Sequence, residues 1–180
     1  QRRFAAAGFD PQRHRTLDDL ARLPTLRKAE LVSDQAETPP YGTNLSQPVS
    51  AFTRLHQTSG TTTGQPLRWV DTPRSWAALM ESWRRIYRLM RLSPSDRCCF
   101  PFSFGPFLGF WAGFEAAVAQ GRFCIAAGGL SSEARLQLIA THGITVLGCT
   151  PTYALRLAEV ARQLGLNLHE LGVRTILVAG

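Results

Sequence analysis

The chain has 180 residues, of which 44% are hydrophobic and 18% are charged, and its formal net charge is +7. This length is enough for a buried core, and the composition excludes a wholly disordered chain. No apolar run approaches the roughly 20 residues of a membrane-spanning helix, and the N-terminus has no apolar signal region, so we expect no membrane partner.

The positive charge is scattered along the chain. A basic protein can bind nucleic acid, but this sequence contains no block of five or six like charges. Its longest cluster, Arg84, Arg85, Arg88 and Arg91, lies on the polar side of a predicted helix. We interpret the cluster as a solvated face and keep nucleic-acid binding only as an alternative.

The four cysteines are predicted to be buried, reduced thiols. They are Cys98, Cys99, Cys124 and Cys149, all in or beside apolar, strand-like segments. None forms a C-x-x-C pair, and no histidine follows at zinc-ligand spacing, so we predict no metal site. Reduced thiols are typical of a cytoplasmic protein.

Residues 1–50 are predicted to form an arm packed on a main body. They are polar and rich in proline toward their end. A short helix is expected over 17–23, with Thr16 as its cap, and a further helical turn over 28–32. The chain starts without methionine, from which we expect that it is a piece of a longer protein.

The pattern changes at residue 51. Residues 51–57 and 67–70 read as strands joined in a hairpin-like way across a Ser/Thr/Gly run. A helix follows over 73–91, with Thr72 as its cap and Pro73 at its first position. Its apolar residues recur at i, i+3, i+4 and i+7, which predicts a stripe facing the core. The stripe consists of Trp76, Leu79, Met80, Trp83, Ile86, Tyr87 and Met90.

Strands and helices then alternate to the end of the chain. The expected strands are 97–102, 122–127, 144–149 and 174–179. The expected helices are 107–120, 132–142 and 152–164. Ser131 should cap the second of these helices, and Gly165 should end the third. This alternation predicts an α/β fold with a mostly parallel sheet flanked by helices, of which 51–180 would be the first part.

The most informative segment runs from Thr58 to Pro66, Thr-Ser-Gly-Thr-Thr-Thr-Gly-Gln-Pro. Its glycines let the backbone bend tightly, and its amides and hydroxyls could surround a polyphosphate. A polar turn or flexible linker is the alternative. The segment is not a Walker loop, because the Gly-Lys-Ser/Thr ending is absent.

The segment resembles the Ser-Gly-Thr-Thr-Gly-x-Pro signature of adenylate-forming enzymes. Four other segments resemble the phenylacetate–CoA ligase branch of that family, in the same order along the chain. They are 23–31 (Leu-Pro-Thr-Leu-Arg-Lys-Ala-Glu-Leu), 102–107 (Phe-Ser-Phe-Gly-Pro-Phe), 149–153 (Cys-Thr-Pro-Thr-Tyr) and 178–180 (Val-Ala-Gly). Two departures concern the loop: it carries one extra threonine, and Gln65 stands where a lysine is common.

The resemblance implies the N-terminal portion of the large domain of an enzyme that adenylates a carboxylic acid with ATP and Mg²⁺ and then forms a thioester with coenzyme A. A phenylacetate-like aryl acid is the expected substrate. The family's catalytic lysine would lie downstream of Gly180, so no catalytic residue is expected in this chain, which should be inactive alone. An adenylating enzyme with a non-CoA acceptor and a non-catalytic nucleotide-binding relative are the alternatives, and a homodimer is left open.

The resemblance also implies three sets of site residues. The set around the ATP phosphates is Thr58, Ser59, Gly60, Thr61, Thr62, Thr63 and Gly64. The acid pocket would comprise Phe102, Phe104, Gly105, Phe107 and Tyr153, with Phe102 and Phe107 flanking an aromatic ring. Ala179 and Gly180 would approach the adenine edge. The alternatives are that the phenylalanines belong to the core and that Tyr153 bonds locally. Glu115 is either a buried acid that needs a partner or a solvated one.

Overall fold

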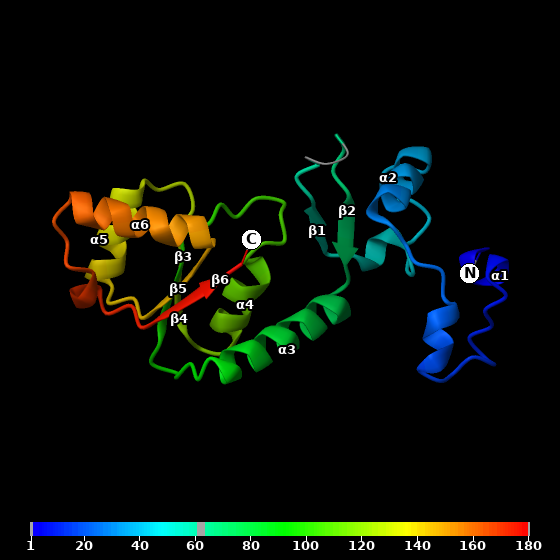
Figure 1. Ribbon diagram of the computed structural model, residues 1–180, viewed down its shortest axis with the longest axis horizontal. Helices are drawn as coiled ribbons and strands as arrows, with labels where there is room; N and C mark the ends of the chain where they lie inside the picture. Colours follow the sequence, from blue (N-terminus) through cyan, green and yellow to red (C-terminus); the bar gives the residue numbers. More distant parts are fainter. Residues whose placement is uncertain (1, 61–63, 180) are drawn as a thin grey trace. The chain divides into compact units, whose positions relative to one another are not determined.

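The computed structural model describes residues 2–60 and 64–179. It divides into two compact units (Figure 1). The first comprises Gln1–Ser46 and Ser59–Arg68, and the second Gln47–Thr58 and Trp69–Gly180. The domain boundary expected at residue 50 stays a prediction. Thr61–Thr63, expected at the ATP phosphates, and Gly180, expected at the adenine edge, lie outside the described residues.

The first unit contains short helices. They are α1 (Arg2–Ala6), the 3₁₀ helix η1 (Asp18–Arg22) and α2 (Lys28–Glu37). The helix expected over 17–23 is a 3₁₀ helix in the structure. At its start, the Asp19 carboxylate accepts from Thr16 N–H, and the Thr16 hydroxyl accepts from Asp19 N–H. Helix α2 is longer than the single turn expected. Its buried Gln35 makes hydrogen bonds to the backbone of Arg68, and a local sequence pattern cannot predict such a distant contact.

A two-stranded sheet follows, made of β1 (Arg54–Gln57) and β2 (Arg68–Asp71). The expected pairing of consecutive strands across the loop is present. The first strand begins later than residue 51, because Val49–Ala51 form a 3₁₀ turn closed by the bond from Ala51 N–H to the Pro48 carbonyl.

Helix α3 (Pro73–Leu89) begins as its sequence predicts. The Thr72 hydroxyl accepts a hydrogen bond from Ser75 N–H, and Pro73 occupies the first turn. The helix ends two residues early, since Arg91 adopts a left-handed φ of 54° and Leu92 N–H bonds back to the Tyr87 carbonyl. Most of the predicted stripe packs inward, but Ile86, at its margin, is 36% exposed.

The remaining strands form one parallel sheet, as expected, with four strands among the described residues. They are β3 (Arg97–Phe100), β4 (Phe123–Ala126), β5 (Val146–Cys149) and β6 (Thr175–Val178). Their order is β4-β3-β5-β6. The connecting helices are α4 (Trp111–Ala119), α5 (Ser132–Thr141) and α6 (Pro151–Gln163), with the 3₁₀ helix η3 (Leu168–Leu171) before β6. Ser131 caps α5 as predicted, and Gly165 follows α6 with a φ of 67°.

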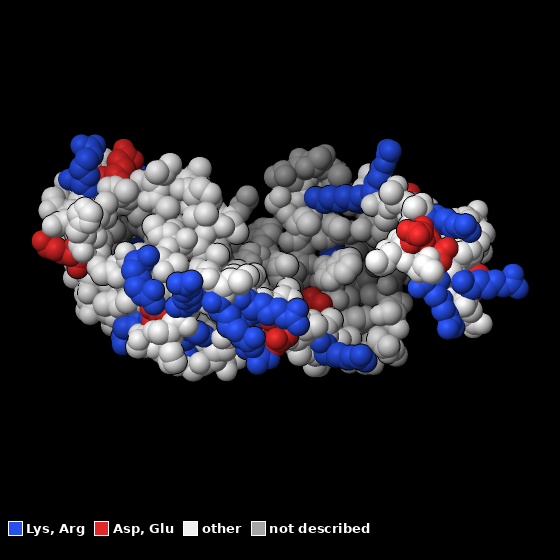
Figure 2. Space-filling model, turned by 60° about the horizontal axis from the view of Figure 1, so that its bottom comes forward, with Lys and Arg blue, Asp and Glu red and all other residues white. Residues whose placement is uncertain are grey.

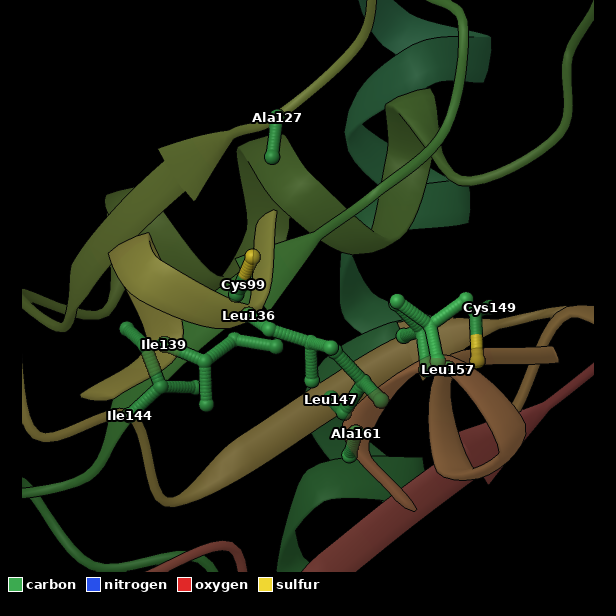
Figure 3. Packing of buried hydrophobic residues seen from close by; sticks show 10 residues of the cluster. Cys99, Ala127, Leu136, Ile139, Ile144, Leu147, Cys149, Leu157 and Ala161 are labelled. Atoms are coloured by element: carbon green, nitrogen blue, oxygen red, sulfur yellow. The ribbon is translucent and has the colours of Figure 1, made fainter. Parts of the chain in front are cut away.

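Helices cover both faces of this sheet. One core cluster packs β3 and β5 against α5 and α6, through residues such as Leu136, Leu147 and Leu157 (Figure 3). The other packs the opposite side chains of the same strands against α3 and α4, through residues such as Tyr87 and Phe100. Side chains alternate along a strand, so consecutive residues enter different clusters.

Three of the four cysteines are buried as predicted, and Cys124 is half-buried. Cys98 enters the cluster with α3 and α4, whereas Cys99 enters the cluster with α5 and α6. Burial raises the pKa of the Cys99 thiol to about 12 and also raises the pKa of Cys149. All four thiols are free in the described structure.

The surface of α3 carries the arginine cluster. Arg84, Arg85 and Arg88 are exposed, and Glu81 forms ion pairs with Arg84 and Arg85. Figure 2 shows basic side chains spread over this face with acidic ones among them. This arrangement agrees with a solvated face. Among residues 2–60 and 64–179, no helix has the length and apolarity to cross a membrane.

Candidate functional site

Two glycines of the predicted phosphate loop lie among the described residues, and both adopt a left-handed backbone conformation. Gly60 has a φ of +75° and Gly64 a φ of +72°, and Gly64 N–H bonds to the Gly60 carbonyl at 2.8 Å. A Cβ on Gly60 would lie 3.0 Å from the Gln65 carbonyl carbon and from the Pro66 nitrogen. Both the backbone angle and the close approach of the chain therefore require glycine at residue 60.

Both strands that flank the loop are held by hydrogen bonds to other segments. Gln57 N–H, one residue before the loop, bonds to the Pro106 carbonyl at 2.6 Å. On the other side, the Gln35 side-chain amide accepts from Arg68 N–H at 2.9 Å and donates to the Arg68 carbonyl at 2.7 Å. The Gln35 side chain thus bonds both backbone groups of Arg68, as the backbone of a neighbouring strand would.

The loop after β3 contains most of the residues expected around the acid. Phe102 packs edge-on against Phe104, with ring centroids 5.0 Å apart, and against Phe110 at 5.8 Å. The Trp111 indole N–H donates to the Gly105 carbonyl at 2.9 Å, which fixes the loop to the start of α4. This irregular loop is also why α4 begins at residue 111 and not at 107.

A surface hollow of about 460 Å³ lies at the carboxyl ends of β3 and β4. Its walls are Ser103, Phe104, Gly105, Ala126, Gly128 and Gly129. A Cβ on Gly128 would stand 2.6 Å from the Phe102 carbonyl oxygen, so this glycine lets the two loops approach each other. The carboxyl edge of a parallel sheet is where ligands of α/β proteins bind.

The hollow includes some of the predicted pocket residues but not all of them. Phe104 and Gly105 form part of its wall, whereas Phe102 and Phe107 do not. The ring of Phe102 packs against the core cluster with α3 and α4, and Phe107 is 41% exposed. Whether these two residues flank an aromatic substrate stays a prediction.

The Tyr153 side chain contacts residues of α5 that lie 18 and 21 positions earlier in the sequence, and its assignment to the acid pocket stays a prediction. Its hydroxyl accepts a hydrogen bond from Arg135 at 2.5 Å and lies 3.1 Å from the Ser132 hydroxyl. The Arg135 guanidinium also lies over the Tyr153 ring and bonds to the Ala127 carbonyl at the end of β4. Ala179 N–H bonds to the Cys149 carbonyl at 3.3 Å, which continues the β5–β6 pairing.

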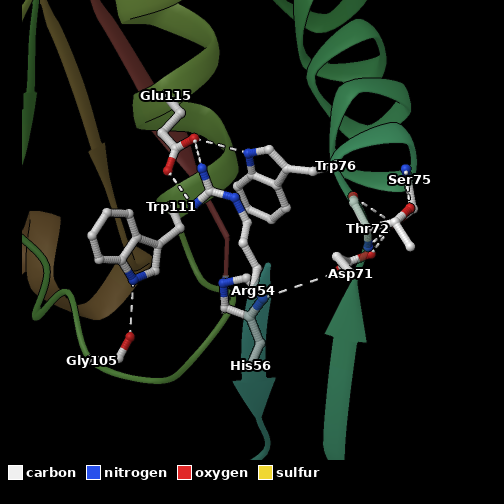
Figure 4. Close-up of polar contacts among 9 residues, drawn as sticks. All are labelled: Arg54, His56, Asp71, Thr72, Ser75, Trp76, Gly105, Trp111 and Glu115. Carbon is white, nitrogen blue, oxygen red and sulfur yellow. Dashed lines mark hydrogen bonds and ion pairs between the residues drawn. The ribbon is translucent and has the colours of Figure 1, made fainter. Parts of the chain in front are cut away.

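A polar cluster at the base of β1 was only partly visible in the sequence (Figure 4). Arg54 donates two hydrogen bonds of 2.8 Å to the Glu115 carboxylate. The Trp76 indole N–H donates to the same carboxylate at 2.9 Å, and the Arg54 guanidinium lies 4.4 Å from the Trp76 ring centroid. Of the two alternatives for Glu115, the structure therefore shows the acid that is paired with other side chains and not the solvated acid.

His56 lies beside this cluster and is 7% exposed. Its ring stacks on Trp76 at 5.2 Å, and its Nδ1 stands 4.0 Å from the Asp71 carboxylate. Among the described residues this nitrogen has no hydrogen-bond partner. Burial lowers the pKa of His56 and outweighs the attraction of Asp71, so the ring is neutral at pH 7.

Several residues of the candidate site were not predicted from the sequence. Gly128 and Gly129 follow β4, where the rule for parallel sheets would have directed attention. The partnership of Arg54 with Glu115 spans 61 positions, and no local pattern signals it. Among the described residues, no group of three or more His, Cys, Asp or Glu side chains is placed to hold a metal ion.

Comparisons with known proteins show which enzymes the chain is similar to. The chain is 31% identical over 169 residues to the phenylacetate–coenzyme A ligase of Escherichia coli (strain K12), which covers 92% of the chain and 37% of that enzyme. The phenylacetate–coenzyme A ligase of Thermus thermophilus is 30% identical over 167 residues, or 93% of the chain and 36% of that enzyme. No family model matches.

A solved structure extends the similarity to the fold. The chain superposes with a TM-score of 0.91 and 30% identity on an open conformation of 2-hydroxyisobutyryl-CoA ligase in complex with 2-HIB-AMP and CoA. The match covers 99% of the chain and 42% of that protein. The chain spans 36–37% of the length of the two curated relatives above.

Proposed function

Because the chain belongs to the phenylacetate–CoA ligase-like family of adenylate-forming enzymes, we propose that the complete protein containing it joins a carboxylic acid to coenzyme A through an acyl-adenylate. The observation that carries the proposal is the likeness of nearly the whole chain to a ligase bound to 2-HIB-AMP and CoA. The activity is proposed for the complete protein and not for this portion alone.

The proposed reaction has two steps. A carboxylate oxygen of the acid attacks the α-phosphorus of ATP, and the bond to pyrophosphate breaks to give an acyl-adenylate. The sulfur of coenzyme A then attacks the acyl carbon, its thiol proton is lost, and AMP leaves. Both steps move negative charge between phosphate and carbonyl oxygens, which hydrogen-bond donors and Mg²⁺ stabilise.

The phosphate loop fits a role in holding ATP. We propose that its backbone amides and its Ser and Thr hydroxyls bind the β- and γ-phosphates over residues 58–64. The fit rests on Gly60, whose missing side chain lets the backbone close tightly without a bulky group in the turn. Mg²⁺ would neutralise phosphate charge. We assign it no ligand in the described residues, where no cluster of three or more candidate side-chain ligands exists.

For the acid, we propose the hollow beside Phe104 and Gly105. Its volume of about 460 Å³ exceeds what a phenyl ring needs, and the Phe104 ring in its wall suits contact with an aromatic substrate. A phenylacetate-like aryl acid is therefore the first candidate. A small hydroxy acid is the second, favoured by the likeness to 2-hydroxyisobutyryl-CoA ligase. Phe102 and Phe107 remain proposed as flanking residues, Tyr153 as a further pocket residue, and Ala179 and Gly180 as adenine-side residues.

The test is acid-dependent exchange of pyrophosphate into ATP by the complete protein with Mg²⁺. The panel contains phenylacetate, benzoate, 2-hydroxyisobutyrate and a straight-chain fatty acid. We expect exchange with phenylacetate, followed by thioester formation when coenzyme A is added. Exchange only with 2-hydroxyisobutyrate would move the substrate to the second candidate. Exchange without thioester formation would favour another acceptor, and ATP binding without exchange would favour a non-catalytic relative.

A further inference from the structure

The cluster of Arg54, Glu115 and Trp76 contributes no group to the proposed chemistry, yet its geometry is tightly defined. The Arg54–Glu115 pair is bidentate, and both side chains are partly buried, with 35% and 27% of their area exposed. Such planar, charge-assisted pairs fix geometry as well as add energy. The Trp76 ring under the guanidinium and its N–H on the carboxylate leave Arg54 little rotational freedom.

The cluster joins two segments that both lead to the candidate site. Arg54 is the first residue of β1, which runs directly into the phosphate loop at Thr58. Glu115 lies on α4, one helical turn after Trp111, whose indole holds the Gly105 carbonyl. The segments β1 and α4 are therefore tied at Arg54–Glu115.

A second tie lies closer to the candidate site. Gln57 N–H bonds to the Pro106 carbonyl, next to Gly105 in the loop after β3. Two attachments, three residues apart along β1, define both the position and the direction of this strand. A single attachment would leave the strand free to pivot about it.

This arrangement has a chemical consequence. Adenylation needs the acid's carboxylate oxygen and the α-phosphorus to approach within roughly 3–3.5 Å and in line, so the groups that hold ATP and those that hold the acid must keep a fixed spacing. The residues proposed for these two tasks lie on separate segments of the chain. Some contact outside both sets has to hold those segments in register.

We propose that Arg54, Glu115 and Trp76 are positioning residues for adenylation, which set Thr58, where the phosphate loop begins, against the Gly105–Pro106 part of the acid loop. This inference rests on the proposed function. The cluster touches neither substrate in this scheme. Its removal therefore slows the reaction of bound substrates more than it weakens the binding of ATP alone.

The experiment compares two isosteric carboxylate substitutions in the complete protein. Glu115→Gln removes the charge that accepts from Arg54 and Trp76. The matched control is Asp96→Asn, because Asp96 also accepts from a backbone N–H, a hydroxyl and an arginine, namely those of Ser93, Thr145 and Arg174. Asp96 immediately precedes β3 and so lies at the amino edge of the sheet, away from the hollow at the carboxyl ends.

Three quantities are measured for each variant: the melting temperature, the dissociation constant of ATP alone, and kcat of pyrophosphate exchange per folded molecule. For Glu115→Gln we expect kcat to fall on the order of ten- to a hundredfold, the effect of a misplacement approaching 1 Å, with a much smaller change in ATP affinity. For Asp96→Asn we expect a lower melting temperature with kcat retained. Arg54→Lys should behave like Glu115→Gln, since lysine cannot form the planar fork.

The outcomes separate this inference from the proposed function. Suppose that the wild-type protein exchanges pyrophosphate and that kcat falls in both Glu115→Gln and Asp96→Asn only as far as their stability falls. The cluster would then be merely structural, and this inference would be wrong while the proposed function stands. A wild-type protein inactive with every acid would remove both proposals together. If Glu115→Gln does not fold, Trp76→Phe decides the question in the same way, because it deletes one N–H donor and keeps an aromatic ring under Arg54.

Discussion

Replacing Gly60 by alanine should weaken ATP binding by an amount that the loop geometry sets. The backbone angle of +75° costs an L-residue other than glycine about 1–2 kcal/mol. The new Cβ would also lie 3.0 Å from the Gln65 carbonyl carbon. Carbon atoms pack best at about 3.5–4.0 Å, so the turn must open by several tenths of an ångström. Under the proposed role in phosphate binding, ATP holds the loop in the backbone form of the structure, so the relaxed loop of the variant must recover the strained form when ATP binds.

The strain energy therefore appears in the affinity. A cost of about 1–2 kcal/mol corresponds to a rise of roughly 5- to 30-fold in the KM for ATP. The assay is pyrophosphate exchange at saturating acid with ATP varied. Gly64→Ala has the same kind of backbone angle, +72°, but no atom of the described residues lies within 4 Å of the new Cβ, so its KM should rise less than that of Gly60→Ala.

Gly121→Ala is the matched control for backbone strain. Gly121, between α4 and β4, has a φ of +77°, and no described residue comes within 4 Å of an added Cβ, so the substitution adds similar strain outside the proposed site. Its melting temperature should fall while its KM for ATP stays at the wild-type value. An unchanged KM in Gly60→Ala, or an equal rise in Gly121→Ala, would refute the assignment of this loop to the phosphates.

Two further predictions concern stability. Burial alone would raise the pKa of Asp96, but the bonds from Thr145 and Ser93 and the pairing with Arg174 lower it below its ordinary value, so its contribution to stability is present above the unfolded pKa of about 3.9 and is lost as the pH falls through the folded pKa. Asp96→Asn should therefore cost about 1–3 kcal/mol at pH 7. The free energies of unfolding of the two proteins, measured by denaturant titration, should begin to converge only as the pH falls below about 3.9 and through the folded pKa of Asp96. A pH-independent difference would contradict this account. Gly148→Ala should cost about 1–3 kcal/mol through overpacking, because its Cβ would lie 2.7 Å from the Phe100 ring in the core; a melting temperature equal to that of the wild type would contradict it.

The sequence by itself predicted the strands of both sheets and the helices between them, but it predicted neither α1 nor η3. Thr72 and Ser131 cap their helices as predicted, because a cap depends on a hydroxyl and an N–H only three residues away. The alternation of apolar strands with helices after residue 96 likewise predicted a parallel sheet covered on both faces. The Thr58–Pro66 segment stood out by its resemblance to a known signature, and its binding of phosphates stays a proposal. The need for glycine at residue 60 is local, because an added Cβ would meet Gln65 and Pro66.

Only the tertiary structure decided how distant segments are joined. The partner of Glu115 is Arg54, 61 positions away, and Gln35 holds the backbone of Arg68, 33 positions away. Such contacts depend on the strand order and on the packing of helices, and a local periodicity carries no information about either. The same holds for Phe102, which the sequence offered equally as a core or a pocket residue, and whose ring packs on Phe104 and Phe110 because the loop after β3 turns back over the core.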